Sequence, residues 1–355
     1  MFKVSNRQKI ILICFFVGVF FVYLTVRTFS YPYPNGRDAW FHILVARAYY
    51  RGENGMTSPI VMNTNSIPYA PLYHLMLTPF VASLGTALLT QQILQCLFYP
   101  LSLLGLMLLA NREQGFTTAM LFGMLLVGTY YGFGMTQARP QTLAMTLFPL
   151  AFYGALKNKA LTFITTATAM FYLYSPIALA LVLGMVVYKL RQKLFNCQVL
   201  AIALMVAPLL LYQATYTLRS NSDIYGRWIR VGDTGLFSET KDFFLNPVFF
   251  LWTGLGVSVI GLGLVGYKLY KYRGLAEFDK LMLLSFLGFL IMMPVWYQRV
   301  FQVAVVPLAF FTAQFIASRQ REVKLALVLF VLWQAVIFSL FEFFMSPPPY
   351  LWKYW

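Results

Sequence analysis

Long, nearly uncharged apolar stretches alternate with short polar segments along the whole sequence. A helix needs about 20 mainly apolar residues to cross a bilayer, and stretches of about this length recur from Ile10 to Phe344. They predict an all-α, polytopic transmembrane helix bundle of about 11 spans. The predicted spans are Ile10–Val26, Leu88–Ala110, Phe116–Met135, Gln141–Leu156, Ala160–Tyr174, Ile177–Tyr188, Val199–Tyr212, Val248–Tyr267, Leu281–Trp296, Val300–Ala317 and Leu325–Phe344.

Two of these stretches, Ala160–Tyr174 and Ile177–Tyr188, lie on either side of Ser175-Pro176 and are each shorter than a full span. They fit either one helix kinked at Pro176 or two short antiparallel helices inside the bundle. The hairpin places the basic residues after Tyr188 on the same side as Lys157, where the positive-inside rule requires them. We therefore predict the hairpin.

Composition agrees with a membrane protein. Hydrophobic residues make up 60% of the 355 positions and charged residues 11%, whereas ordinary soluble domains have about 45–50% and about 25%. The net charge of +16 is typical of cytoplasmic loops that obey the positive-inside rule, so we expect membrane lipids and no nucleic acid as partners. The three cysteines lie far apart and predict neither a disulfide framework nor a metal site.

The first apolar stretch resembles a signal peptide, but no small-residue cleavage site follows it, so we expect a retained helix with a cytoplasmic N-terminus. Under this topology the inner segments contain ten Lys and six Arg, and the outer segments contain nine Arg with only Lys241 and Lys353. Arg presents a rigid fork that suits phosphate or carboxylate. An anionic ligand on the outer face is one interpretation, and arginines that reach lipid headgroups are the other.

We expect a single transmembrane domain over residues 1–355, without a soluble C-terminal domain. Two outer loops are long enough to build a site: residues 27–87, with short interfacial helices that include Pro71 to Gly85, and residues 213–247. A full span at Pro71 to Gly85 would invert every later loop and place most Lys outside. The second loop fits an acceptor-binding loop, a lid or a simple connection.

The candidate chemistry lies in the first outer loop, in the sequence Gly-Arg-Asp-Ala-Trp-Phe-His at residues 36–42. Asp38 opens a predicted helix that continues to about Arg51, and an N-cap is its structural explanation. As a carboxylate among arginines, Asp38 also fits a general base or a metal ligand. His42 lies four residues later on the same helical face, and His74 is the other histidine of the chain. Asp38 and His42 are too few ligands for a metal site by themselves, so polar interface histidines remain the alternative.

These motifs, together with Tyr-Ala-Pro-Leu-Tyr-His at residues 69–74, resemble the GT-C superfamily of polyprenyl-phosphate-sugar-dependent membrane glycosyltransferases. Two later stretches also resemble the family: Gln-Ala-Arg-Pro-Gln at residues 137–141, and Tyr-Gln-Arg-Val-Phe at residues 297–301, which leads to Pro307. The resemblance covers the order and sidedness of motifs over most of the chain, although each motif is short.

The resemblance implies an inverting transfer of a sugar, a hexose such as mannose, from a polyprenyl-phosphate or dolichyl-phosphate donor on the outer or luminal face of a plasma or endoplasmic-reticulum-type membrane. It implies that Asp38 is the catalytic base and that three arginines contact the donor phosphate. It further implies a set of substrate-binding residues. The phosphate contacts are Arg299, Arg139 and Arg37, and the substrate-binding set is His42, Tyr69, His74, Tyr297, Gln298 and Arg227.

The sequence also departs from the family pattern. The Trp-Trp-Asp acceptor motif is absent, and Gln137 and Gln141 occupy positions where metal-using members have acids. We therefore expect no certain cofactor, with a divalent metal as the alternative, and an acceptor hydroxyl on a lipid-linked glycan, a polysaccharide or a protein. A secondary transporter or lipid flippase and a non-catalytic family member are the competing functions. Charges at the outer edge rather than the midplane favour surface chemistry over transport.

Overall fold

The computed structural model describes residues 5–30, 37–53, 70–129, 139–193, 196–219, 255–322, 324–325 and 328–329. For residues 37–38, 176, 216–219, 255–259 and 292–302 it describes the backbone alone. Within these ranges all regular secondary structure is helical, in agreement with the predicted all-α class.

Three helices of the described part are long and apolar enough to cross a membrane: α1 (Asn6–Phe29), α5 (Leu84–Gln114) and α10 (Cys197–Arg219). Only 17% of the most apolar window of α1 and of α10 is buried within the protein. Apolar helix surface that is not covered by protein requires a lipid environment. The protein is therefore an integral membrane protein, as the sequence predicts.

The segment between residues 160 and 192 folds back on itself. Helix α9 (Ala160–Gln192) has non-helical backbone angles at Tyr174 (φ −158°, ψ 95°). Lys189 Nζ donates a 3.0 Å hydrogen bond to Oδ1 of Asn158, although a straight helix would separate these residues by about 46 Å. The two arms of α9 are therefore antiparallel, and the predicted hairpin is confirmed.

Helix α15 (Glu277–Ala317) doubles back in the same way. Asp279 and Gln314 lie 35 positions apart, about 52 Å in a straight helix, yet Gln314 Nε2 is 3.3 Å from Asp279 Oδ2. The rings of Phe278 and Phe310 are also in contact, with centroids 5.0 Å apart. The chain therefore reverses between residues 291 and 303, close to the predicted boundary between two spans.

Small residues allow the long helices to approach closely. A Cβ added to Gly184 of α9 would collide with the backbone of Leu284 in α15, and one added to Gly288 would collide with the backbone of Ala180. Close contact through small residues is how membrane helices gain packing energy without a hydrophobic driving force between them. The first arm of α15 is thus held directly against the second arm of α9.

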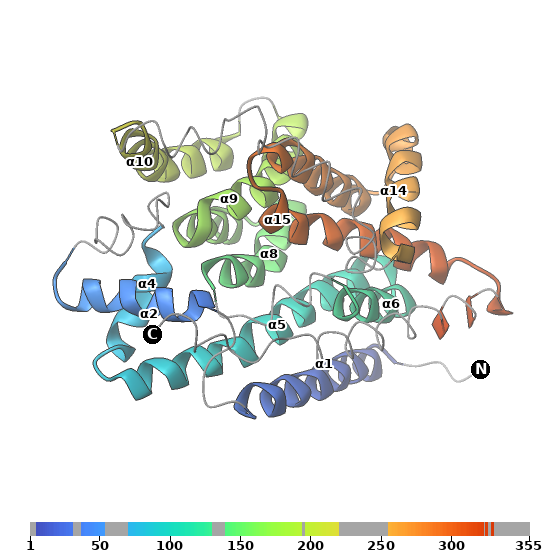
Figure 1. Ribbon diagram of the computed structural model, residues 1–355. Coiled ribbons are helices and arrows are strands. Elements are labelled where there is room, and N and C mark those ends of the chain that lie inside the picture. The colour runs from blue at the N-terminus through green and yellow to red at the C-terminus, as the bar shows by residue number, and fades with distance from the viewer. Residues whose placement is uncertain are drawn as a thin grey trace, which may run out of the picture.

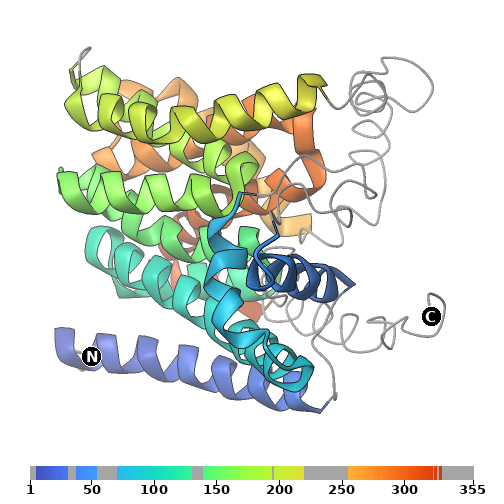
Figure 2. The ribbon, with the colours of Figure 1, turned by 90° about the vertical axis from the view of Figure 1, so that its left-hand side faces the viewer.

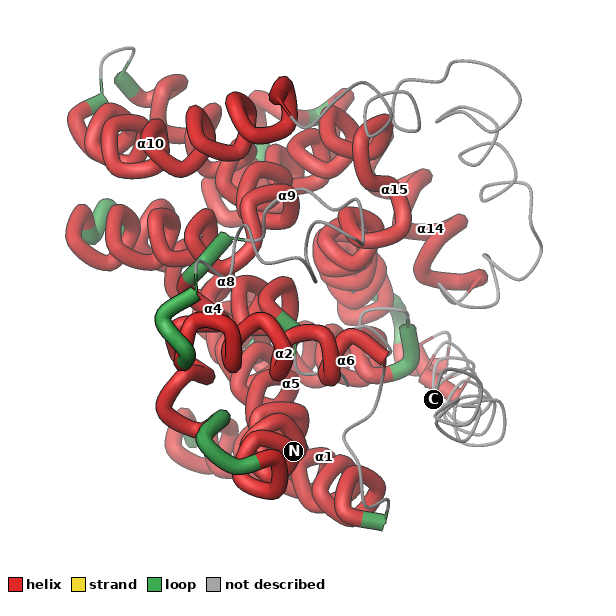
Figure 3. Tube along the Cα trace, turned by 60° about the vertical axis from the view of Figure 1, so that its left-hand side comes forward, coloured by secondary structure: helices red, strands yellow, loops and turns green. Residues whose placement is uncertain are grey.

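The rest of the described structure consists of further helices. The longer ones are α6 (Phe116–Val127), α8 (Pro140–Leu156) and α14 (Leu255–Tyr270), and the shorter ones are α2 (Arg37–Tyr50), α4 (Leu72–Leu77), η1 (Thr78–Phe80) and η2 (Tyr272–Gly274). Figure 2 shows α1 and α10 on opposite sides of the bundle, with other helices running side by side between them. The tube in Figure 3 shows how short the described connections between helices are. Helices α2 and α4 lie together near the end of the bundle where α1 ends (Figure 1).

Several predicted boundaries are wrong. Helix α6 ends at Val127, where Gly128 and Thr129 form a turn, so the predicted continuation of this helix to Met135 fails at a glycine. Helix α10 continues to Arg219 and includes the first seven residues of the predicted second loop.

The segment from Pro71 to Gly85 contains α4, η1 and the start of α5, so it is not a span, as predicted. Most of the last predicted span, Leu325–Phe344, lies outside the described residues.

Candidate functional site

The two histidines of the chain meet between α2 and α4. His42 Nδ1 lies 3.0 Å from His74 Nε2, and both side chains are 1% exposed. The ring of Tyr73 packs edge-on against His42, with centroids 5.4 Å apart. A hydrogen bond between two ring nitrogens requires that one carries a proton and the other presents a lone pair. Residues 32 positions apart thus form one buried polar contact.

Helix α5 adds a polar side chain next to this pair. The Tyr73 hydroxyl donates a 3.1 Å hydrogen bond to Oε1 of Gln91, which is fully buried. Within the described part of the protein, Nε2 of Gln91 has no hydrogen-bond partner. A buried amide of this kind costs about 1–3 kcal/mol, unless water or a ligand binds it. Gln91 therefore gives this region a donor that a bound oxygen atom can use.

Arg139 brings positive charge to the same region from the start of α8. Its backbone is extended at the N-cap position (φ −133°, ψ 159°), and Pro140 follows as the first helical residue. The Arg139 charge acts on the Tyr73 hydroxyl. Proline suits the first turn because the turn needs no N–H there, and the helix N-terminus adds its own partial positive charge. Arg139 and the start of α8 together favour an anion at this place.

Burial decides the protonation of the uncharged groups. Loss of water lowers the pKa of His74 to about 3, and a backbone hydrogen bond to Ala70 opposes this shift only weakly. Burial raises the pKa of Tyr73 above its ordinary value, against the smaller effects of Gln91 and Arg139. Near neutral pH, His74 and Tyr73 are therefore both neutral. We call the group His42, Tyr73, His74, Gln91 and Arg139 the Arg139 cluster.

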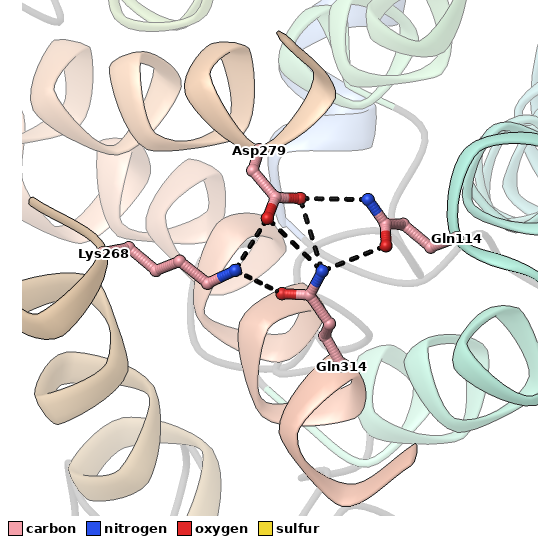
Figure 4. A network of polar contacts seen from close by, with 4 residues as sticks. All are labelled: Gln114, Lys268, Asp279 and Gln314. Atoms are coloured by element: carbon pink, nitrogen blue, oxygen red, sulfur yellow. Dashed lines mark hydrogen bonds and ion pairs between the residues drawn. The ribbon is translucent and has the colours of Figure 1, made fainter. Parts of the chain in front are cut away.

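A second polar region lies where α5 ends and α15 begins (Figure 4). Lys268 Nζ is 2.7 Å from Asp279 Oδ2 and donates to Gln314 Oε1, also at 2.7 Å. Gln114 Nε2 donates to Asp279 Oδ1 at 3.1 Å, and its Oε1 accepts from Gln314 at 3.0 Å. Every member has a charged or amide partner, so this network joins α5, α14 and both arms of α15. We call it the Gln114 cluster.

The two clusters lie at opposite ends of the bundle. Gln91 and Gln114 are 23 residues apart on α5, which corresponds to about 34 Å. Arg139 precedes Lys157 by 18 residues, about 27 Å, and Lys157 Nζ is 2.7 Å from Glu113, the neighbour of Gln114. Both separations are close to the hydrocarbon thickness of a bilayer, about 30 Å. The clusters are therefore separated by about the thickness of a bilayer.

The predicted base and the late arginine are described by their backbone alone. Asp38 lies in the first turn of α2, which begins at Arg37 and also contains His42. Arg299 lies in the part of α15 where the chain reverses, 15 residues before Gln314, which corresponds to about 22 Å of helix from the Gln114 cluster. The backbones of both residues thus lie toward the end of the bundle that contains the Arg139 cluster.

Other predicted site residues are not described. Tyr69 and Arg227 lie outside the described ranges, and for Arg37, Tyr297 and Gln298 the backbone alone is described. Among the described residues no three His, Cys, Asp or Glu side chains gather in a way that would hold a metal ion. The side chain of Asp38, the candidate metal partner of His42, is not among the described side chains. The pair Asp38 and His42 therefore stays a prediction.

Comparison with known proteins identifies the fold. No family model matches the chain, and no curated protein matches it. The structure is similar to the crystal structure of ArnT from Cupriavidus metallidurans bound to undecaprenyl phosphate, with a TM-score of 0.55 and 12% sequence identity. The chain has the fold of ArnT. The similarity covers 86% of this chain and 60% of ArnT, so the chain spans less than two thirds of the length of ArnT.

Two residues of the Arg139 cluster, Tyr73 and Gln91, are absent from the candidates that the sequence provides. Tyr73 lies directly before His74, within the motif at residues 69–74. Gln91 belongs to a run of three buried glutamines with Gln92 and Gln95, placed in an otherwise apolar helix. Three amides on one apolar span are costly unless they are hydrogen-bonded, and this is the signal that identifies the region in the sequence.

Proposed function

We propose that the protein is a membrane glycosyltransferase that takes a sugar from a polyprenyl-phosphate-linked donor. The observation that carries the proposal is the fold shared with ArnT, which binds undecaprenyl phosphate. The position of Arg139 and of the backbones of Asp38 and Arg299 toward one end of the bundle supports it. This result agrees with the sequence resemblance to the GT-C superfamily.

In the proposed reaction Asp38 accepts the proton of an acceptor hydroxyl. The hydroxyl oxygen forms a bond to the anomeric carbon of the sugar, on the face opposite the phosphate. The bond between that carbon and the phosphate oxygen breaks, and the lipid phosphate departs with the electron pair. The configuration at the anomeric carbon is inverted, and the acceptor is a lipid-linked glycan, a polysaccharide or a protein hydroxyl.

Arg139, Arg299 and Arg37 are the proposed contacts of the donor phosphate. The leaving phosphate gains negative charge as the glycosidic bond breaks, so a fixed guanidinium group stabilises the transition state more than the ground state. The N-terminus of α8 adds partial positive charge next to Arg139. The side chains of Tyr73 and His74, which are neutral near pH 7, add no negative charge beside Arg139.

Charge distribution supports an orientation for this site. The Gln114 end collects lysines from several connections, including Lys157, Lys189 and Lys268. The positive-inside rule assigns such an end to the cytoplasm. The Arg139 cluster would then face the outer or luminal side, where the sequence places the donor.

The proposal is tested by sugar transfer from an undecaprenyl-phosphate-linked sugar in purified protein. Asp38→Asn removes the base without changing its size, so we expect at least a 100-fold loss of rate with unchanged folding. Arg299→Lys keeps the charge but loses the fork, and we expect weaker donor use. The matched control is Arg191→Lys at the other end of the bundle, where Arg191 pairs with Glu277. Wild-type rates in Asp38→Asn exclude Asp38 as the base.

The competing transporter function requires a separate measurement. Proteoliposomes loaded with labelled polyprenyl-phosphate sugar would show movement of the lipid across the bilayer without transfer to an acceptor. Movement that persists in Asp38→Asn, with no transfer by the wild type, would contradict the transferase.

A further inference from the structure

Helix α2 is held mainly through small and apolar side chains. Its buried apolar residues are Ala39, Ile43, Val45, Ala46 and Ala48, and it packs against α4, η1 and α5. Contacts of this kind are non-directional, so they resist a slide or a rotation of the helix only weakly. A slip of one residue turns a helix by about 100°, which would turn Asp38 away from the face it now shares with His42.

The hydrogen bond between His42 and His74 is directional and fully buried. It joins the middle of α2 to α4 at 3.0 Å, with the two ring centroids 5.1 Å apart. Tyr73, the residue next to His74, is in turn fixed to Gln91 of the long helix α5. The histidine pair therefore connects α2, through α4, to a rigid element of the bundle.

Asp38 lies one helical turn before His42. Four residues correspond to about 6 Å along the axis and about 40° around it. A contact that fixes the position and rotation of His42 therefore also fixes the backbone at Asp38.

We propose that the His42–His74 hydrogen bond is a positioning contact that holds the first turn of α2, and with it Asp38, in register at the active site. This inference rests on the proposed function and extends it to two residues that act through Asp38. The pair would contribute to the rate of the chemical step and little to donor binding.

The surroundings favour positioning over storage of a proton. The pair is in contact with the rings of Phe41 and Tyr73, and the Tyr73 hydroxyl is in turn bonded to Gln91 and lies within the electrostatic reach of Arg139. Tyr73 is neutral and Arg139 is positive, so neither stabilises a protonated ring. Burial itself lowers the pKa of His74 to about 3, so its ring stays neutral near pH 7 within the 3.0 Å contact to His42.

Activity provides the first test. His74→Leu removes the contact, and we expect kcat for transfer to fall at least 10-fold while KM for the donor changes less than 2-fold. His74→Gln places an amide near the position of Nε2, so we expect kcat within about 3-fold of wild type. Ser102→Ala is the matched control, because it removes another buried hydrogen bond, from Ser102 Oγ to the carbonyl of Met145, without touching α2. A wild-type kcat in His74→Leu overturns the proposal.

Hydrogen exchange tests the same claim without any activity. In His74→Leu we expect faster amide exchange in peptides that cover α2, and in Ser102→Ala exchange in α2 as slow as in the wild type. Equal protection of α2 in all three proteins overturns the positioning role. A wild-type protein that transfers no sugar, but whose α2 loses protection in His74→Leu, contradicts the proposed function and keeps the positioning of α2.

Nitrogen NMR of the two rings completes the test. The chain has only two histidines, so protein labelled with ¹⁵N-histidine gives signals from this pair alone. We expect a neutral His74 ring at pH 5 and a loss of the hydrogen-bonded N–H in His74→Leu and in His42→Leu. A ring that titrates near its ordinary pKa, or signals that shift on addition of equimolar Zn²⁺, would overturn the proposal, and the second result would instead indicate a metal site.

Discussion

Polar side chains are buried at both ends of the bundle, but they have different partners at each end. At the Gln114 end Lys268 and Asp279 form an ion pair whose remaining positions are filled by two glutamines. At the Arg139 end the buried groups include His74 and Tyr73, which are neutral near pH 7, and Arg139 brings a positive charge. A complete network fixes helices in place, so the Gln114 end has a structural role. A binding role is what we propose for the Arg139 end, where a guanidinium group and the N-terminus of α8 both favour an anion.

The largest expected effect is on stability, at the Gln114 end. Asp279→Ala leaves Lys268 without its carboxylate, and the loss of one partner from a buried pair costs roughly 3–5 kcal/mol. Lys268→Met with Asp279→Leu removes both charges and should recover most of this loss. Thermal unfolding of the purified protein in detergent measures both. A double variant that is no more stable than Asp279→Ala would show that the pair is not the cause.

A large effect on activity, with little effect on folding, is expected at the Arg139 end. Arg139→Gln removes a proposed phosphate contact, so we expect roughly a 100-fold loss of transfer, equivalent to about 2.7 kcal/mol. The transfer rate of Arg139→Lys should lie between those of the wild type and of Arg139→Gln, because lysine keeps the positive charge but lacks the forked guanidinium group. Rates are measured over a range of donor concentrations. If Arg139→Gln lowers stability and leaves the rate per folded molecule unchanged, the two ends do not differ in role.

The third expected effect is a loss of stability in acid that depends on His74. In the folded protein the pKa of His74 is lowered to about 3, whereas a histidine in the unfolded chain has a pKa of about 6.5. The unfolded state therefore binds the proton first, so stability is complete above about pH 6.5 and declines as the pH falls toward 3. Between pH 7 and pH 5 the loss is on the order of 2 kcal/mol. His74→Gln should flatten this part of the pH profile, and an unchanged profile would contradict a buried neutral histidine.

The smallest effect is expected for the exposed ion pair at the Gln114 end. Arg191 Nη2 is 3.4 Å from Glu277 Oε2, and the two side chains are 37% and 48% exposed. Pairs of this kind contribute about 0–1 kcal/mol, and the guanidinium group also stacks over Tyr272. Glu277→Gln should therefore shift the unfolding temperature by little and leave transfer unchanged. If Glu277→Gln lowered the stability as much as Asp279→Ala does, burial would not explain the difference between the Arg191–Glu277 pair and the Lys268–Asp279 pair.

Much of the helical architecture follows from the sequence pattern, because a bilayer imposes a length and an apolar composition on each span. The hairpin around Tyr174 is predicted by charge sidedness alone and is confirmed by the contact of Lys189 with Asn158. Helix ends are less well predicted. The boundary at Val127 depends on one glycine, and the extension of α10 to Arg219 shows that a helix can continue beyond its apolar stretch.

The candidate site, too, is predicted only in part from the sequence. The resemblance of the sequence to the GT-C superfamily is what selects His42, His74 and Arg139 as candidates. Their proximity is a matter of tertiary structure, since residues 42, 74 and 91 belong to three different helices and Arg139 is the N-cap of a fourth. The hydrogen bond of His42 to His74 and the contact of Tyr73 with Gln91 depend on how those helices pack.

The sequence thus determined that the chain crosses a membrane repeatedly, because solvent preference is a local property of each apolar stretch. Only the tertiary structure decided which polar groups share an environment. Charge pairing and hydrogen bonding act over a few ångströms in space, and the order of residues along the chain does not fix those distances.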